Sequence, residues 1–321
     1  MDFVYADENR ADIDYFRESV DFETGDEDAL NDFEITTSIL KKGYTVYAPG
    51  TEWGGIVEYL KGTNTGNVPV WKGHTWRGLL MQDIIEPPAG SDYRTVSGEA
   101  NGIIKNLLSG VLGGFFRVPD RGSGLSVSSY QFPLFCKVGT GIMDMLHKYG
   151  YRLSIHAEKE VPGEPYIVYC EAVPAEKVAG EFNADNKVPM TFIDNGMGVN
   201  HLVCMGSGEL QERQRIDLYL QPDGSIGKTR YYTGFAERKA YYDYGNAQSL
   251  EDLEENGRKR LKEIASGKAI ELKLPDRDYE IGDVACARYR EHDLYIERRI
   301  TRKILRRTET GEEIEYKVEG D

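Results

Sequence analysis

Short runs of alternating apolar and polar residues, each ended by glycine, proline or asparagine, fill most of the chain and predict a mainly β protein. Near the N-terminus, strands are expected at residues 44–48, 53–59 and 68–71. They are separated by a Pro49-Gly50 turn and by a glycine- and asparagine-rich turn at 62–67. Short strands at this spacing are typical of a small barrel or sandwich.

The pattern changes at Glu86-Pro87-Pro88, after which apolar residues recur at helical spacing. The first expected helix runs from about residue 100 to 112, with Ser97 as its N-cap and Gly113-Gly114 as its stop. One further helix and two strands follow, at 140–149, 151–156 and 166–170. This region is therefore expected to be a helix-bearing α+β insert.

Strand-like alternation returns at residue 199. Strands are expected at 199–205, 215–221 and 228–233, and in the tail at 294–304 and 314–318. One helix, at about 250–266, interrupts them. Ser249 is its expected N-cap, and its acidic residues precede its basic ones, which complements the helix dipole.

The predicted fold class is therefore α+β and mainly β, with two small tube-like β-barrel domains and a helix-containing α+β region between them. The expected boundaries are 1–85 for the first barrel, 86–190 for the insert, and 191–321 for the second barrel with its single helix.

The net charge of −15 is distributed unevenly along the chain. Residues 1–34 carry 13 acidic and 2 basic side chains, whereas residues 286–307 carry 8 basic and 3 acidic ones. A mostly acidic surface repels the phosphates of nucleic acids. The arginines of 286–307 lie on strand-like sequence without interleaved aromatic residues. This pattern favours a solvated strand face or a protein interface over nucleic-acid binding.

Composition narrows the class of protein further. No apolar run approaches the roughly 20 residues of a membrane span, and the N-terminus lacks the basic start of a secretion signal. The four cysteines, Cys136, Cys170, Cys204 and Cys286, have neither zinc-ligand nor CxxC spacing. We therefore expect reduced, buried thiols in a protein folded in a cytoplasm, and no metal or cofactor.

The segment 199–210 superficially resembles a catalytic site, because it holds a histidine, a cysteine and a serine between glycines. His201 and Cys204 are three residues apart in a strand-like run, so their side chains are expected on opposite faces. Gly206-Ser207-Gly208 lacks the spacing of the G-x-S-x-G nucleophile elbow. A structural histidine, a buried thiol and a tight turn are the favoured interpretations.

Other catalytic signals are weaker. Gly227-Lys228-Thr229 ends like a phosphate-binding loop, but Pro222 replaces the required glycine and no helix is expected to follow. Cys136 and His147 lack the local signatures of thiol proteases. Acidic residues are abundant, which neither supports nor excludes a pair of glycosidase carboxylates. The sequence therefore indicates no catalytic, cofactor or metal site.

Several segments, taken in order, resemble the baseplate hub (tail-associated) proteins of phage tails and phage-tail-like particles. These segments are 1–7, 50–57, 73–80, 85–87, 96–101, 199–210 and 279–284. The resemblance implies a non-enzymatic, homotrimeric ring that joins a six-fold tail tube to a three-fold spike or tip. The implied partners are the tail tube, spike or tip, other baseplate proteins and the tape measure protein, with DNA only in transit.

The resemblance also implies a place in the tail baseplate of a particle assembled in the bacterial host cytoplasm. Some relatives carry a C-terminal peptidoglycan hydrolase, which is not expected here because the chain stops after the last hairpin. The opposed charge blocks suggest that subunits pair through charge. Its candidate residues are Asp26, Glu27, Asp28, Arg298, Arg299, Arg302 and Arg306.

Two other function classes stay open at this point. A tail-associated peptidase or peptidoglycan hydrolase requires a Cys/His or carboxylate pair that only the fold brings together. A carbohydrate- or receptor-binding β module requires glycan binding by the isolated chain. The sequence does not distinguish a contractile tail from a flexible one.

Overall fold

The computed structural model describes residues 1–26, 31–61, 68–177, 190–194, 198–245, 247, 249–265, 268–272, 279–289, 294–308 and 311–318. The chain forms two compact units. Unit 1 comprises Met1–Val188 and Lys273–Glu319, and unit 2 comprises Pro189–Leu272. Strands make up 42% of the structure and helices 19%, which confirms the α+β, mainly β class.

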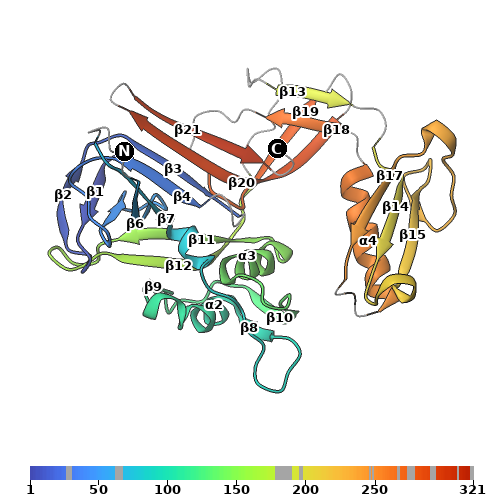
Figure 1. The fold of residues 1–321 in the computed structure, drawn as a ribbon, viewed down its shortest axis with the longest axis horizontal. Coiled ribbons are helices and arrows are strands. Elements are labelled where there is room, and N and C mark those ends of the chain that lie inside the picture. Colours follow the sequence, from blue (N-terminus) through green and yellow to red (C-terminus); the bar gives the residue numbers. More distant parts are fainter. Residues whose placement is uncertain are drawn as a thin grey trace. The chain divides into compact units, whose positions relative to one another are not determined.

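Unit 1 is built on a curled, half-barrel sheet of ten strands (Figure 1). Their order is β19-β20-β3-β4-β7-β6-β5-β1-β2, with β21 also paired to β20. The strands are β1 (Phe3–Ala6), β2 (Asp12–Phe16), β3 (Val20–Gly25), β4 (Asp32–Thr36), β5 (Thr45–Tyr47), β6 (Gly54–Lys61), β7 (Val70–Thr75), β19 (Val284–Tyr289), β20 (Leu294–Thr308) and β21 (Gly311–Val318). One buried cluster, which includes Phe3, Phe22, Phe33, Trp53 and Leu305, lines this sheet.

The insert of unit 1 follows a short helix, α1 (Trp76–Leu80), at the end of β7. Its elements are β8 (Thr95–Glu99), α2 (Ala100–Leu108), the 3-10 turn η1 (Val111–Gly113), β9 (Phe116–Arg117), β10 (Ser126–Gln131), α3 (Val138–Lys148), β11 (Tyr151–Glu158) and β12 (Ile167–Pro174). Strands β11, β12 and β9 form one sheet, and β8 pairs with β10.

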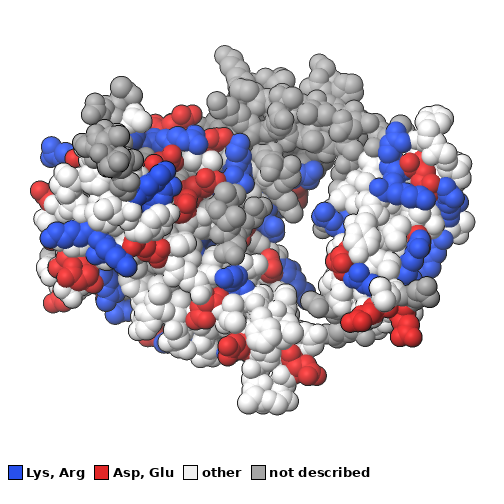
Figure 2. Space-filling model, in the orientation of Figure 1, with Lys and Arg blue, Asp and Glu red and all other residues white. Residues whose placement is uncertain are grey.

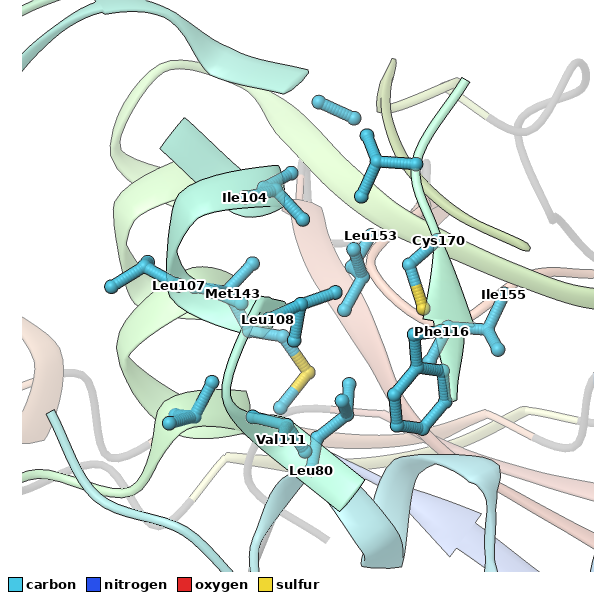
Figure 3. Packing of buried hydrophobic residues seen from close by; sticks show 14 of the residues in the cluster. Leu80, Ile104, Leu107, Leu108, Val111, Phe116, Met143, Leu153, Ile155 and Cys170 are labelled. Carbon is cyan, nitrogen blue, oxygen red and sulfur yellow. The ribbon is translucent and has the colours of Figure 1, made fainter. Parts of the chain in front are cut away.

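A second apolar core joins the two insert helices to the insert sheet. Figure 3 shows Ile104 and Leu108 of α2 and Met143 of α3 packed with Leu153 and Cys170 of the strands. The apolar stripes read from the sequence therefore face one another. This core also includes Tyr47 of β5 and Trp76 of α1, so the insert packs directly against the N-terminal part of unit 1.

The C-terminal strands belong to a different domain from the one that the sequence pattern predicted. We expected residues 191–321 to form one barrel domain, but β19, β20 and β21 belong to unit 1. Strand β20 pairs antiparallel with β3, opposing Arg306 to Asp21 and Ile304 to Glu23. The pairing joins basic and acidic segments nearly 300 residues apart in the chain, a partner choice that local periodicity does not encode.

Unit 2 has a four-stranded sheet in the order β16-β15-β14-β17. Its elements are β13 (Met190–Asp194), β14 (His201–Met205), η3 (Leu210–Glu212), β15 (Arg215–Leu220), β16 (Ile226–Gly227), η4 (Gly234–Ala236), β17 (Lys239–Asp243), α4 (Leu250–Ala265) and β18 (Lys268–Leu272). Helix α4 packs on β14 and β15, and β13 pairs with β18. The expected cap is present, since the Asp252 N–H donates to Ser249 Oγ at 3.1 Å.

Two local predictions are wrong. The N-cap of α2 is Glu99, whose carboxylate accepts the Gly102 N–H at 2.9 Å, whereas Ser97 lies inside β8. A glutamate there complements the helix dipole as serine would not. The strand expected at 228–233 is also absent, because β16 ends at Gly227 and the next strand, β17, begins at Lys239.

Candidate functional site: a buried charge cluster in unit 1

Seven charged or titratable residues meet where the curled sheet, the insert and the C-terminal strands come together in unit 1. We call them the Arg77 cluster: Asp26, Glu52, Arg77, His147, Glu280, Arg299 and Lys303. They come from the end of β3, the β5–β6 turn, α1, α3, the segment before β19, and β20. Each part of unit 1 thus contributes a charge to one site.

Arg77 is the centre of the cluster and only 2% exposed. Its Nε and Nη2 both donate to Glu52 Oε2, at 3.3 and 3.1 Å, and Nη2 also donates to the Leu153 carbonyl of β11 at 2.9 Å. Its Nη1 lies 3.1 Å from Met143 Sδ of α3 and 3.9 Å from Asp26 Oδ1. One guanidinium therefore holds the turn before β6, the insert sheet and α3 together.

Lys303 of β20 reaches the same carboxylate from the opposite side. Its Nζ lies 3.5 Å from Glu52 Oε1 and 3.2 Å from Glu280 Oε2, above the Trp53 ring. Burial alone would lower the pKa of Lys303, but the charges of Glu52 and Glu280 raise it. Burial alone would likewise raise the pKa of Glu52, but Arg77 and Lys303 lower it. Both groups are therefore charged in the folded protein.

For Asp26 and His147, in contrast to Glu52 and Lys303, the pKa shifts favour the neutral form of the side chain. Burial raises the pKa of Asp26 to about 6, against the opposing pull of Arg77 and Arg299. Burial, together with the positive charges of Arg299 and Arg77, lowers the pKa of His147 to about 3. Their side chains approach at 3.8 Å from His147 Nε2 to Asp26 Oδ2. Neither group has the strong, close partner that Glu52 has.

These two shifts predict opposing pH effects on stability. The Asp26 contribution is present below pH 3.8 and lost as pH rises through about 6, whereas the His147 contribution is present above pH 6.5 and lost as pH falls toward about 3. When the pH is lowered from 7 to 4, the unfolding free energy of His147→Gln is expected to rise by about 2–3 kcal/mol relative to that of wild type. The unfolding free energy of Asp26→Asn is expected to fall by about as much relative to wild type. Urea unfolding at each pH measures this, and parallel pH profiles for both variants would contradict it.

Seven charged residues were proposed from the sequence as interface residues, and those that the structure describes lie in different surroundings. Asp26 is buried in the Arg77 cluster with Arg299 at 3.7 Å, and Glu27 and Asp28 lie outside the described residues. Arg302 pairs with Glu23 at 3.1 Å, and Arg306 with Glu315 at 3.3 Å, both inside this chain. The Arg298 guanidinium donates to its neighbouring backbone carbonyl at Glu297.

The opposed charge blocks therefore meet within one chain, through β3 and β20. On the visible face of unit 1 in Figure 2, acidic and basic side chains lie interspersed and do not form separate fields. Intrachain pairing accounts for Arg302 and Arg306, while a role between subunits stays a prediction for Arg298.

The sequence did not single out Arg77, Glu52 or Lys303, although a signal was present. Glu52 precedes Trp53, and Arg77 stands between Trp76 and the apolar Gly78-Leu79-Leu80. A charge inside an apolar run that faces the core needs a buried partner. The sequence shows that such partners are required, but only the fold shows which ones they are.

The expected placement of His201 and Cys204 on opposite faces of one strand is confirmed. His201 lies on one face of β14, where its two ring nitrogens are each 2.8 Å from a carboxylate oxygen, of Glu237 and of Asp217. Cys204 lies on the other face, in the apolar cluster under α4. Burial raises the pKa of the Cys204 thiol to about 11, so it is a poor nucleophile at neutral pH. Gly208 has a positive φ, but Gly206-Ser207-Gly208 opens a longer loop that contains η3 and ends where β15 begins at Arg215, so the tight turn is not what forms there.

The structure does not support Cys136 and His147 as a thiol-protease pair. Burial and the nearby charge of Asp144 raise the pKa of Cys136, and the partner of His147 is Asp26. Within the described ranges, no group of three His, Cys, Asp or Glu side chains is placed to hold a metal ion. No helix in that same part of the chain is long and apolar enough to cross a membrane.

Sequence and structure comparisons give different answers for this chain. No protein-family model and no curated protein matches the sequence. The structure matches a tail protein from Neisseria meningitidis MC58, with 12% identity, a TM-score of 0.53, and coverage of 100% of this chain and 96% of that one.

Two prophage proteins are similar over the same extent. For the 43 kDa tail protein of prophage MuSo2 from Shewanella oneidensis the identity is 11%, the TM-score 0.57 and the coverage 99% and 98%. For the prophage tail protein gp18 from Listeria monocytogenes EGD-e they are 15%, 0.52, and 100% and 95%. The chain therefore has the fold of phage tail proteins, which confirms the resemblance at the level of the fold.

Proposed function

We propose that this protein is a structural hub subunit of the baseplate in a phage tail or phage-tail-like particle. The observation that carries the proposal is the end-to-end match, which covers 95–98% of three tail proteins as well as nearly all of this chain. A chain that matches tail proteins over nearly their whole length is suited to the same architectural task.

In this role, three copies form a ring that joins the six-fold tail tube to a three-fold spike or tip. Its partners are the tube protein, the spike or tip protein, other baseplate proteins and the tape measure protein. DNA passes through the ring only in transit, and the net charge of −15 disfavours adhesion of its phosphates. The ring is assembled in the host cytoplasm and resides in the baseplate.

The Arg77 cluster supports a scaffold role. A subunit that transmits force between a tube and a spike benefits from parts that do not shift, and the cluster links every part of unit 1. The buried pairs of Glu52 with Arg77 and Lys303 favour one arrangement over its alternatives, because any displacement leaves a buried charge unpaired.

A zymogram on peptidoglycan tests the proposal against the hydrolase class. The purified chain is expected to leave no cleared band, while a lysozyme control clears the gel. Clearing by this chain would contradict the scaffold role.

Charge reversal at Arg298 tests the assembly. Arg302 pairs with Glu23 inside the chain, so its reversal would also disturb the fold, whereas Arg298 contacts only a neighbouring carbonyl among the bonds described. Arg298→Glu is expected to weaken ring formation in sedimentation velocity and leave the unfolding midpoint unchanged. A ring of unchanged affinity would remove Arg298 from the interface.

A further inference from the structure

His201 of unit 2 is a buried histidine held between two carboxylates. It lies on β14, the strand between β15 and β17 (Figure 1), and is 4% exposed. Its Nδ1 is 2.8 Å from Glu237 Oε1, and its Nε2 is 2.8 Å from Asp217 Oδ1. The Tyr219 ring lies against the imidazole, with the ring centroids 4.3 Å apart. Both ring nitrogens are therefore committed to acidic partners, and these partners come from two different segments.

The two carboxylates are ionised and cannot donate to the ring. A hydrogen bond from Arg215 above all lowers the pKa of Asp217. Desolvation alone would raise the pKa of Glu237, but hydrogen bonds from His201 and Arg230 lower it. An ionised carboxylate only accepts hydrogen bonds, whereas a neutral imidazole has one donor and one acceptor nitrogen. Both contacts at His201 are therefore hydrogen bonds only when the ring carries a proton on each nitrogen.

Loss of one ring proton turns one of these contacts from attraction into repulsion. The nitrogen that loses the proton then points a lone pair at a carboxylate oxygen 2.8 Å away. The other charged groups that face the site are Arg215, Arg230 and Lys239, whose Nζ lies 3.6 Å from Glu237 Oε2. These cations pair with the same carboxylates and keep them ionised, and α4 packs on the opposite face of the sheet. The ring is therefore the group that changes charge.

The contact with Glu237 helps to fasten residues 234–243, which run from η4 through β17 and which we call the η4–β17 segment. The N–H groups of Asn200 and His201 both donate to the Arg238 carbonyl of this segment, at 3.0 and 3.1 Å. Phe235, in η4, is 88% exposed. The charge of the ring therefore bears on how firmly a turn with an exposed aromatic side chain is held.

We propose that His201 is a proton-dependent clamp on the η4–β17 segment. With a proton on each ring nitrogen, it joins Asp217 of β15 to Glu237. When one proton passes to solvent, the ring holds only one of the two carboxylates, and the segment loosens. The clamp is therefore closed at lower pH and opens as the pH rises through the titration of the ring. This inference concerns unit 2 and does not depend on the proposed function.

NMR of the full chain between about pH 5 and 9 tests the clamp. The nitrogen resonances of the imidazole report the proton on each ring nitrogen. Amide exchange at Asn200, His201 and Arg238, whose N–H groups bond across the junction, reports how firmly the segment is held. Once one ring proton is lost, we expect these amides to exchange about tenfold faster, after correction for the intrinsic effect of pH. The ring and the amides are expected to share one midpoint.

Glu237→Gln separates the clamp from other effects of pH. Its side-chain amide can donate to a ring nitrogen that lacks a proton, so the segment is expected to keep its protection over the whole pH range. The control is Glu158→Gln in unit 1, because Glu158 Oε2 lies 3.8 Å from Nε2 of another histidine, His156, outside the clamp. This control is expected to keep the wild-type pH profile. Asp217→Asn, at the other ring nitrogen, provides the same test if Glu237→Gln does not fold.

Three results would overturn the inference: a ring that keeps the same number of protons throughout the range, a ring titration that leaves amide exchange in the segment unchanged, or wild-type pH dependence in Glu237→Gln. None of these results bears on the hub role, which the zymogram and the assembly of particles test separately.

Discussion

Replacing Arg77 with methionine is expected to lower the unfolding free energy of unit 1 by about 3–5 kcal/mol, because it leaves Glu52 buried without its principal partner. Methionine keeps most of the side-chain volume, so the loss reports the charge and its hydrogen bonds. All three tryptophans, Trp53, Trp71 and Trp76, lie in unit 1, so tryptophan fluorescence during urea unfolding monitors this unit alone.

Two companion variants make the Arg77 result specific. Arg117→Met removes another arginine that pairs with a glutamate, Glu160 at 3.1 Å, but both partners are about half exposed, so the expected loss is under about 1 kcal/mol. Adding Glu52→Gln to Arg77→Met is expected to restore part of the stability by removing the orphaned charge. Equal losses at Arg77 and Arg117 would contradict a central role for the cluster.

Replacing Trp76 with leucine is expected to cost about 2–4 kcal/mol, the second largest effect. Trp76 is fully buried where α1 meets the insert, and its ring lies 5.8 Å from that of Phe115 and 6.1 Å from that of Tyr166. Gly54 makes room for it, since a Cβ at Gly54 would lie 2.6 Å from the indole. The indole therefore fills the space between the curled sheet and the insert.

The room at Gly54 provides a sharp check on the Trp76 assignment. Gly54→Ala is expected to destabilise wild type by about 1–3 kcal/mol through overpacking. In the Trp76→Leu background the same alanine is expected to cost much less, because the clashing ring atoms are gone. Urea unfolding followed through Trp53 and Trp71 measures both, and strict additivity would show that the two residues do not compete for one space.

Local features of the fold were predictable from the sequence because local physics determines them. The apolar stripe of residues 100–112 predicted α2, and the charge order of 250–266 with Ser249 predicted α4. Both follow from helical periodicity and capping, which involve neighbours within a few residues. Strand alternation likewise separated His201 from Cys204 correctly.

Long-range pairing was not predictable in this way. Nothing in residues 294–308 indicates that β20 pairs with β3, so those strands were assigned to the wrong domain. Arg307 shows the same limit: its Nη2 donates to the carbonyls of Phe16 and Glu18, both at 2.8 Å, and so ties β20 to the chain just after β2. Such contacts join segments that are far apart in sequence, and the local pattern of apolar and polar residues does not indicate them.

The Arg77 cluster could be anticipated only in part. A charged residue beside Trp53 or Trp76 signals a buried polar partner, but residues from 26 to 303 contribute to the site and their convergence is a property of the fold. The acidic and basic blocks were visible as charge runs and were assigned to contacts between subunits. The structure shows that part of each block neutralises the other within one chain.

The proposed hub role places this chain at the baseplate of the assembled tail. Imaging of assembled particles by electron microscopy, with this subunit carrying a compact label, tests it most directly. We expect three labels arranged with three-fold symmetry at the baseplate, between the end of the tube and the spike. Labels along the tube or the tail fibres, or intact particles without any label, would contradict the claim.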